Sequence, residues 1–168
     1  LMADYAIVDP DLLASCPAAL IAANGMDALT QLLEAYVSTR ANPMTDALAL
    51  AGLAAVRDGL LVWYRGGEGA AAGREKMALA ALWSGVCLAQ AGLGSVHGLA
   101  QPLGSFFPIS HGVVCGALVA GATRINIEGL RARAPDSTAL AKYATIGRLL
   151  GAEPGAGDDA ARDSLLAT

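Results

Sequence analysis

Residues 24–64 read NGMDALTQLLEAYVSTRANPMTDALALAGLAAVRDGLLVWY, two apolar segments divided by an Asn-Pro pair. Apolar side chains recur at intervals of three and four along the first segment, as on one face of a helix: Met26, Leu29, Leu33 and Tyr36. Asn42 is a good N-cap and Pro43 a good first residue for a second helix. That helix should stop at the glycines of RGGEG, residues 65–69. The stretch therefore predicts two consecutive helices.

The rest of the chain continues this helical pattern, and the alternation of apolar and polar residues that marks a half-buried strand does not occur in it. Further helices are expected over residues 70–91, around His97, from His111 to about Thr123, and over residues 137–151. The polar sequence NIEGLRARAPDS, residues 126–137, is expected to connect the last two. The sequence thus predicts an all-α fold, a helical bundle that forms one domain over residues 1–168.

The composition limits the classes of function. With 55% apolar and 15% charged residues, a chain of 168 residues can bury a substantial core. A net charge of −4 and only 5% aromatic residues provide neither a basic stripe nor stacking groups, so no nucleic-acid partner is expected.

The cysteines and the first residues bear on the cellular compartment. Cys16, Cys87 and Cys115 form an odd set without CxxC spacing, so we interpret them as reduced core residues, with redox or zinc-ligand roles as the alternatives. The opening LMADYAIVDPDLL lacks the basic and apolar regions of a signal peptide. A cytoplasmic location is the resulting expectation.

A stretch without Asp, Glu, Lys or Arg, between Met77 and Thr123, raises the question of a membrane hairpin. Spanning a bilayer takes about 20 continuous apolar residues. Glycines, prolines, His97 and Gln101 interrupt this stretch, and its segments are expected to be too short to span. Buried core helices, and no membrane partner, are the prediction.

Two polar pairs stand at helical spacing in these apolar segments. Asp27 and Gln31 form one pair and His97 and Gln101 the other, each four residues apart and so on one helix face. Both helices are expected to be buried. A buried carboxylate needs a cation or several donors to offset its lost hydration.

A divalent metal ion would meet this need. Asp27 offers oxygen, His97 and His111 offer nitrogen, and Gln31 could add a carbonyl oxygen, a mixed set that suits Fe(II), Zn(II), Mn(II) or Co(II). Glu34, further along the first helix, is expected to support the site rather than bind the metal. The alternative is that the histidines are satisfied core residues and that Asp27 caps or polarises its helix.

Other chemistry has less support in the sequence. No GxSxG elbow accompanies Ser95 or Ser110, and the apolar surroundings of Cys115 should raise its pKa. No strand followed by GxGxxG and no P-loop is present. The remaining acidic residues are expected at helix starts and on solvated faces: Asp46, Asp58, Asp158 and Asp159.

Four segments in order resemble the iron-containing (group III) alcohol dehydrogenases: GMDALTQLLEAYVS, ANPMTDALAL, GSVHGLAQPLG and SHGVVCGALV. The resemblance implies the metal-binding, all-helical C-terminal domain of that family, with a dehydroquinate synthase-like fold. It also implies that the N-terminal α/β domain, which binds NAD(P), and the extreme C-terminus are absent from this chain. The chain alone is then expected to be inactive.

The resemblance also suggests roles for individual residues. Asp27, His97 and His111 match three of the family's four metal ligands, while the fourth, usually a histidine, is Gln31 here. Gln101 stands where many members have another histidine near the substrate, so a role in orienting the substrate is implied. An amide cannot relay a proton and is a weaker ligand than imidazole.

The function implied is that of an NAD(P)-dependent oxidoreductase interconverting alcohols and aldehydes or ketones, with Fe(II) the first expectation for the metal and Zn(II) the second. Its partner would be a small alcohol or aldehyde, and an exposed apolar face is compatible with a homo-oligomer. Two alternatives are a metal-independent reductase resembling maleylacetate reductases and a non-catalytic helical module.

Overall fold

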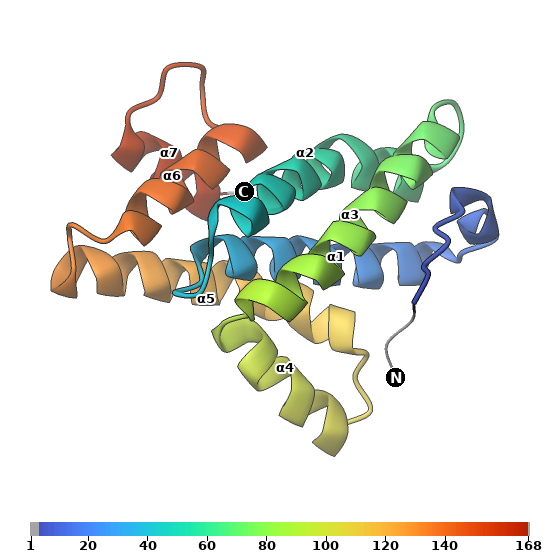
Figure 1. Ribbon diagram of the computed structural model, residues 1–168, viewed down its shortest axis with the longest axis horizontal. Coiled ribbons are helices and arrows are strands. Elements are labelled where there is room, and N and C mark those ends of the chain that lie inside the picture. Colours follow the sequence, from blue (N-terminus) through green and yellow to red (C-terminus); the bar gives the residue numbers. More distant parts are fainter. Residues whose placement is uncertain (1–3, 168) are drawn as a thin grey trace.

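The computed structural model describes residues 4–167, and within them it contains helices and no strand, which confirms the all-α prediction (Figure 1). A short 3-10 helix, Pro10–Leu13, precedes the α-helices. Their bounds are α1 Ala18–Val37, α2 Pro43–Arg65, α3 Ala70–Ala91, α4 Ser95–Phe106, α5 His111–Arg133, α6 Thr138–Leu150 and α7 Asp158–Ala167.

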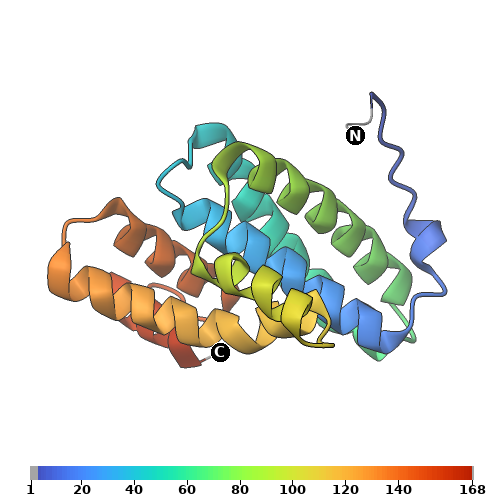
Figure 2. The ribbon, with the colours of Figure 1, turned by 90° about the horizontal axis from the view of Figure 1, so that it is seen from below.

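Helix α1 is the centre of the bundle. It packs against α2 and α3 on one side and against α5 on the other, as Figure 2 shows, and it also contacts α4 and α6. Leu32 and Ala35 of α1 are fully buried, together with Leu53 of α2. The polar residues of α1 are consequently held in a helix that is covered on several sides.

The predicted start of α2 is confirmed in detail. Asn42 Oδ1 accepts hydrogen bonds from the backbone N–H groups of Met44 (3.1 Å) and Thr45 (3.2 Å). Thr45 Oγ1 in turn accepts one from the Asn42 N–H at 2.9 Å, which completes a capping box. The helix ends before Gly66, whose φ of 72° lies in the left-handed region.

Helix α5 is longer than the sequence predicts. It continues through Asn126 and Gly129 to Arg133, so the expectation of a polar connector over residues 126–137 is wrong for most of that segment. The tertiary environment explains the difference, because Ile127 is fully buried and Asn126 Nδ2 donates to the Tyr143 hydroxyl at 3.3 Å. Residues that look like a loop by composition are held as helix by packing on α6.

The acidic residues assigned to helix starts lie there. Asp46 is in the first turn of α2, and Asp158 and Asp159 begin α7. Asp46 is only partly exposed, and it accepts a 2.7 Å hydrogen bond from Lys142 Nζ that ties α2 to α6. It is therefore more than a solvated helix start.

Two helices of the described residues, α2 and α5, are long and apolar enough to cross a membrane. Together α3 and α4 would add a third span, but they meet at a bend of 104°. The expectation that segments near Thr123 are too short is thus wrong for α5, which is 23 residues long. The criterion is one of length and composition, and the absence of a membrane partner stays a prediction.

Candidate metal centre

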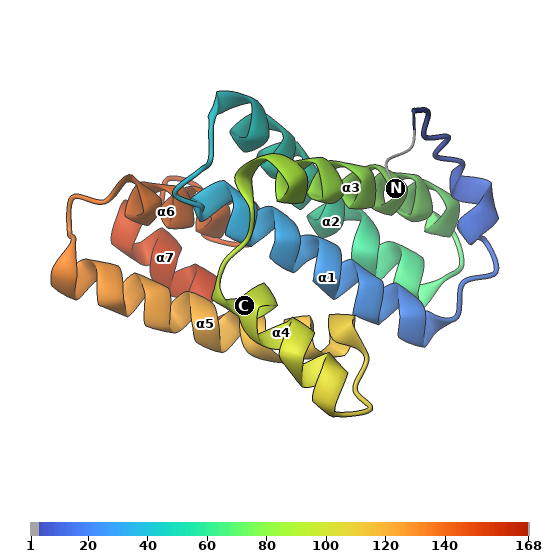
Figure 3. The same cartoon turned by 60° about the horizontal axis from the view of Figure 1, so that its bottom comes forward.

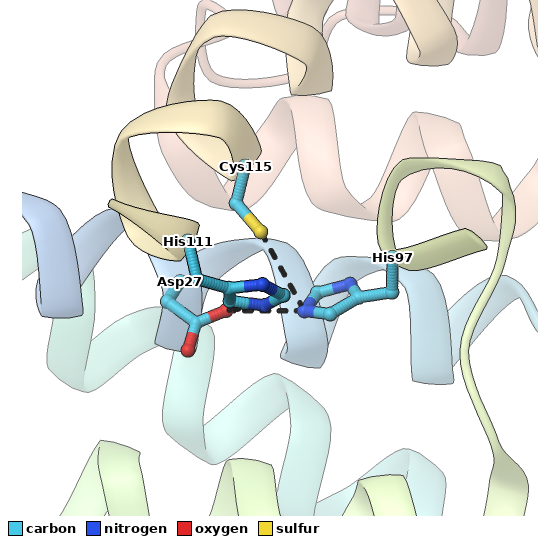
Figure 4. Close-up of side chains that lie close together, drawn as sticks. All are labelled: Asp27, His97, His111 and Cys115. Carbon is cyan, nitrogen blue, oxygen red and sulfur yellow. Dashed lines mark hydrogen bonds and ion pairs between the residues drawn. The ribbon is translucent and has the colours of Figure 1, made fainter. Parts of the chain in front are cut away.

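Four side chains from three helices converge beside α1 (Figure 4). Asp27 comes from α1, His97 from the first turn of α4, and His111 and Cys115 from the start of α5. One oxygen, nitrogen or sulfur atom of each lies within 4.8 Å of the corresponding atoms of the other three. The two histidines that are far from Asp27 in sequence thus meet it in space.

Both imidazoles approach the same oxygen of Asp27. His97 Nε2 lies 3.0 Å and His111 Nε2 3.5 Å from Asp27 Oδ1. The rings are 5.4 Å apart between centroids and inclined at 52°. His97 is the more buried, with 12% of its side chain exposed against 43% for His111, so the site is open to solvent on the His111 side.

Glu34 orients His97 from behind. Its Oε2 lies 2.7 Å from His97 Nδ1, and its Oε1 accepts a 2.7 Å hydrogen bond from the Val96 N–H at the start of α4. In the metal-free site a protonated His97 would donate both ring N–H groups, Nδ1–H to Glu34 and Nε2–H to Asp27, and a bound metal would take the place of the Nε2 proton. The supporting role expected for Glu34 agrees with these contacts.

The electrostatics of the cluster attract positive charge. Burial alone would lower the pKa of His97, but its hydrogen bonds to Asp27 and Glu34 and their negative charges raise that pKa to about 9. Burial acts to raise the pKa values of Asp27 and Glu34, but the hydrogen bond that each makes with His97, together with the other nearby donors and positive charges, lowers both. The two carboxylates thus stabilise a cation between them, whether it is an imidazolium or a metal ion.

Two glycines allow the helices to approach this closely. A Cβ on Gly112, next to His111, would collide with the backbone carbonyl of Ala23 in α1. A Cβ on Gly94 would lie 2.8 Å from Glu34 Oε1. A side chain at position 112 would push α5 away from α1, whereas one at position 94 would displace the Glu34 carboxylate that contacts His97.

The side chains of Gln31 and Gln101 differ in their position relative to the cluster. Gln31 meets Asp27, since its Nε2 donates to Asp27 Oδ2 at 3.2 Å. Gln101 is exposed, so the expectation that it faces inward with His97 is wrong. The reason is that only Val96 and Ala100 of α4 are buried, and the helix runs along the edge of the molecule beside the start of α5 (Figure 3).

Cys115 is the member of the cluster that the sequence analysis assigns to the core and leaves out of the predicted metal ligands. Its Sγ lies 3.7 Å from His97 Nε2, and its side chain is fully buried. Burial and the nearby Asp27 raise the pKa of Cys115 to about 12 in the absence of metal, in the direction expected from its apolar neighbours. All three cysteines are free, although Cys16 is only partly buried. The available signal was the spacing of four residues between His111 and Cys115 on one helix.

The donor set fits a divalent transition metal. Carboxylate oxygen, imidazole nitrogen and thiol sulfur are the ligand types that Zn(II) and Fe(II) take in proteins. His97 also has the carboxylate partner on its second nitrogen that metal-binding histidines usually have. Asp27, His97 and His111 could therefore hold a metal ion in this cluster.

Comparisons with known proteins identify the family of the chain. The sequence model of a family described as Fe-containing alcohol dehydrogenase family, C-terminal, matches residues 21–167. Alcohol dehydrogenase 4 of Saccharomyces cerevisiae is 40% identical over 128 residues, which are 76% of this chain and 33% of that protein. The 1-propanol dehydrogenase of Citrobacter freundii is 38% identical over 164 residues, 97% of this chain and 42% of that protein. The chain thus spans well under half the length of these relatives.

Solved structures show the same relationship. A crystal structure of 1,3-propanediol oxidoreductase superimposes with a TM-score of 0.83 at 37% identity, covering 95% of this chain and 39% of that one. A sulfoacetaldehyde reductase from Bifidobacterium kashiwanohense, in complex with NAD+, gives a TM-score of 0.75 at 27% identity, covering 94% of this chain and 38% of that one. By sequence and by fold, the chain belongs to the iron-containing alcohol dehydrogenase family.

Proposed function

We propose that this chain is the metal- and substrate-binding helical domain of an NAD(P)-dependent oxidoreductase that interconverts small alcohols and their aldehydes or ketones. The observation that carries the proposal is the convergence of His97 Nε2 and His111 Nε2 on one oxygen of Asp27. The relatives named for 1-propanol and 1,3-propanediol support a small alcohol as the substrate class.

Asp27, His97 and His111 would hold the divalent ion. Bound there, the ion supplies Lewis acidity toward the hydroxyl or carbonyl oxygen of the substrate. Asp27 contributes the negative charge of the site, and Glu34 fixes the His97 ring through Nδ1. Iron is the first expectation for the metal on family grounds, and zinc is the second.

The nicotinamide cofactor would be bound by a part of the protein outside this chain. Relatives are more than twice as long as the segment they share with it, and one solved neighbour is a complex with NAD+. The chain's own sequence has no glycine-rich turn after a strand with which to bind a dinucleotide. We therefore expect the 168-residue chain alone to bind metal without oxidising alcohol.

An exposed apolar surface beside the metal centre supports this arrangement. Large apolar side chains on α4, on the following loop and at the start of α5 are 45–81% exposed: Leu99, Phe106, Phe107, Ile109 and Val113. A surface of this kind next to an open metal site suits contact with substrate and with the nucleotide-binding part. Gln101, exposed on the same helix, is placed in this proposal as a group that orients the substrate.

The test uses the longer protein that contains this chain. His97→Ala should abolish metal binding and alcohol-dependent reduction of NAD(P) together, because it removes the most buried nitrogen donor. Asp58→Asn is the control, since Asp58 is exposed on α2, a helix that carries no member of the cluster, and pairs with Arg57. Full activity in His97→Ala would refute the assignment.

One observation favours a second candidate, a metal-independent reductase. His97 already has a carboxylate partner on each ring nitrogen, Asp27 on Nε2 and Glu34 on Nδ1, so the site is hydrogen-bonded without a metal. In that enzyme, His97 and His111 would orient a substrate oxygen directly by hydrogen bonds. Activity of the longer protein that persists after exhaustive chelation, with no metal recovered, would identify this candidate.

A further inference from the structure

Cys115 has a position that the proposed function does not use. Its Sγ stands within 4.8 Å of a donor atom from each of Asp27, His97 and His111. It is fully buried among Val96, Ala100 and Val114, the residues that join α4 to α5. The thiol is therefore directed into the cluster from its apolar side.

The two oxygens of Asp27 distinguish Cys115 from Gln31 as the fourth donor. Both imidazoles approach Oδ1, and the Cys115 Sγ lies 3.7 Å from His97 Nε2, the same atom that faces Oδ1. Gln31 is instead hydrogen-bonded to Oδ2, through its amide nitrogen. An ion centred between the imidazoles and Oδ1 would have the sulfur beside it, while the amide belongs to the other edge of the carboxylate.

The ligand chemistry of thiolate and amide also favours Cys115 over Gln31 as the fourth donor. A thiolate is an anionic ligand with high affinity for Zn(II) and related borderline-soft ions, whereas a neutral amide oxygen is a weak one. Two nitrogens, one oxygen and one sulfur would give the metal four protein donors, and an ion that expands to five-coordinate would still accept the substrate oxygen required by the proposed function. On binding, the S–H bond breaks, its proton leaves for solvent, and the sulfur lone pair forms the bond to the metal.

We propose that Cys115 Sγ, and not the Gln31 amide, is the fourth protein ligand of the divalent metal, with Asp27, His97 and His111. The inference rests on the proposed function in needing a metal at this cluster. It goes beyond that function in naming a sulfur ligand.

The test loads the metal-free protein with Co(II) and records its absorption spectrum. A Co(II)–thiolate bond gives an intense ligand-to-metal charge-transfer band in the near ultraviolet, and we expect this band in the wild type. Cys115→Ser should lose the band and bind Zn(II) at least about tenfold more weakly, since even the loss of a residue that only supports a ligand usually costs about 10- to 100-fold. Cys87→Ser is the matched control, because Cys87 is equally buried but contacts the Thr45 carbonyl in α3's interface with α2.

Gln31→Ala separates the two candidate ligands. We expect it to keep the charge-transfer band and to change Zn(II) affinity by less than about threefold. A measurement that needs no variant is X-ray absorption at the zinc edge of the wild type, where one sulfur at about 2.3 Å is expected.

The outcomes distinguish this inference from the proposed function. A zinc shell of nitrogen and oxygen alone, or a charge-transfer band that persists in Cys115→Ser, would overturn the sulfur ligand and leave the metal site standing. A wild-type protein that binds no metal would overturn both. If Cys115→Ser fails to fold, the zinc-edge spectrum of the wild type decides the question by itself.

Discussion

Glu34 Oε2 lies 2.7 Å from Nδ1 of His97 and thereby turns Nε2 of the same ring toward Asp27. Glu34 is 5% exposed and reaches across from α1 to the first turn of α4, where it also accepts from the Val96 N–H. One carboxylate therefore fixes both the ring and the helix end that carries it.

We predict that Glu34→Gln lowers Zn(II) affinity by about 10- to 100-fold, the usual cost of losing the partner of a metal-binding histidine. Gln keeps the size of the side chain but removes the charge that holds the Nδ1 proton. Competition titration with a chromophoric chelator measures the change. Glu68→Gln, at an exposed position in the α2–α3 loop, is the control and should leave the affinity unaltered. Equal affinity in the two variants would contradict the orienting role.

Much of this site could be predicted from spacing. Asp27 and Gln31 lie on one helical face and do meet, and the two histidines in an uncharged segment do converge on Asp27. The same rule misplaced Gln101, because α4 is buried only at Val96 and Ala100 and its outer face carries the amide to solvent. Helical spacing states which side chains share a face, but not which face the rest of the protein covers.

Cys115 shows a second limit of the sequence. An apolar neighbourhood indicates a core cysteine and is also what a ligand on the inner wall of a metal site has around it. Only the approach of α4 and α5, through Val96, Ala100 and Val114, decides between the two descriptions. The sequence pattern alone does not show that α4 and α5 pack against each other in this way.

The length of α5 gives a prediction about stability. Ile127 is fully buried in a segment whose composition resembles a loop, while Ile125, two residues earlier, is 68% exposed. Ile127→Ala should lower the free energy of unfolding by about 2–5 kcal/mol. Ile125→Ala should change it by no more than about 0.5 kcal/mol. Urea denaturation followed by circular dichroism compares the pair, and similar values for both would mean that α5 does not pack into the core beyond Thr123.

Close packing at the start of α5 gives another prediction about stability. A Cβ on Gly112 would meet the carbonyl of Ala23, so Gly112→Ala must shift α5 away from α1. We expect a loss of about 1–3 kcal/mol in the free energy of unfolding, typical of overpacking, and weaker metal binding because His111 moves with the helix. Gly121→Ala is the matched control, since a Cβ there has no heavy atom within 4 Å. It should be neutral or stabilise the helix by up to about 1 kcal/mol. Unchanged metal affinity in Gly112→Ala would show that the position of His111 does not depend on this contact.

Metal binding should itself stabilise the fold, because Asp27, His97 and His111 come from three helices that meet only in the native state. With Zn(II) at 100 times its Kd, the gain expected from mass action is about 2.7 kcal/mol, visible as a rise in Tm that chelator reverses. Asp27→Asn should abolish this rise, because the amide has lost the charge that both imidazoles face. Asp58→Asn should retain it, since Asp58 lies on the surface of α2 in a pair with Arg57. A Zn(II)-dependent rise of equal size in Asp27→Asn would place the bound ion away from this cluster, and no rise in any variant would favour the metal-independent enzyme, in which the two carboxylates around His97 stabilise an imidazolium instead of a metal.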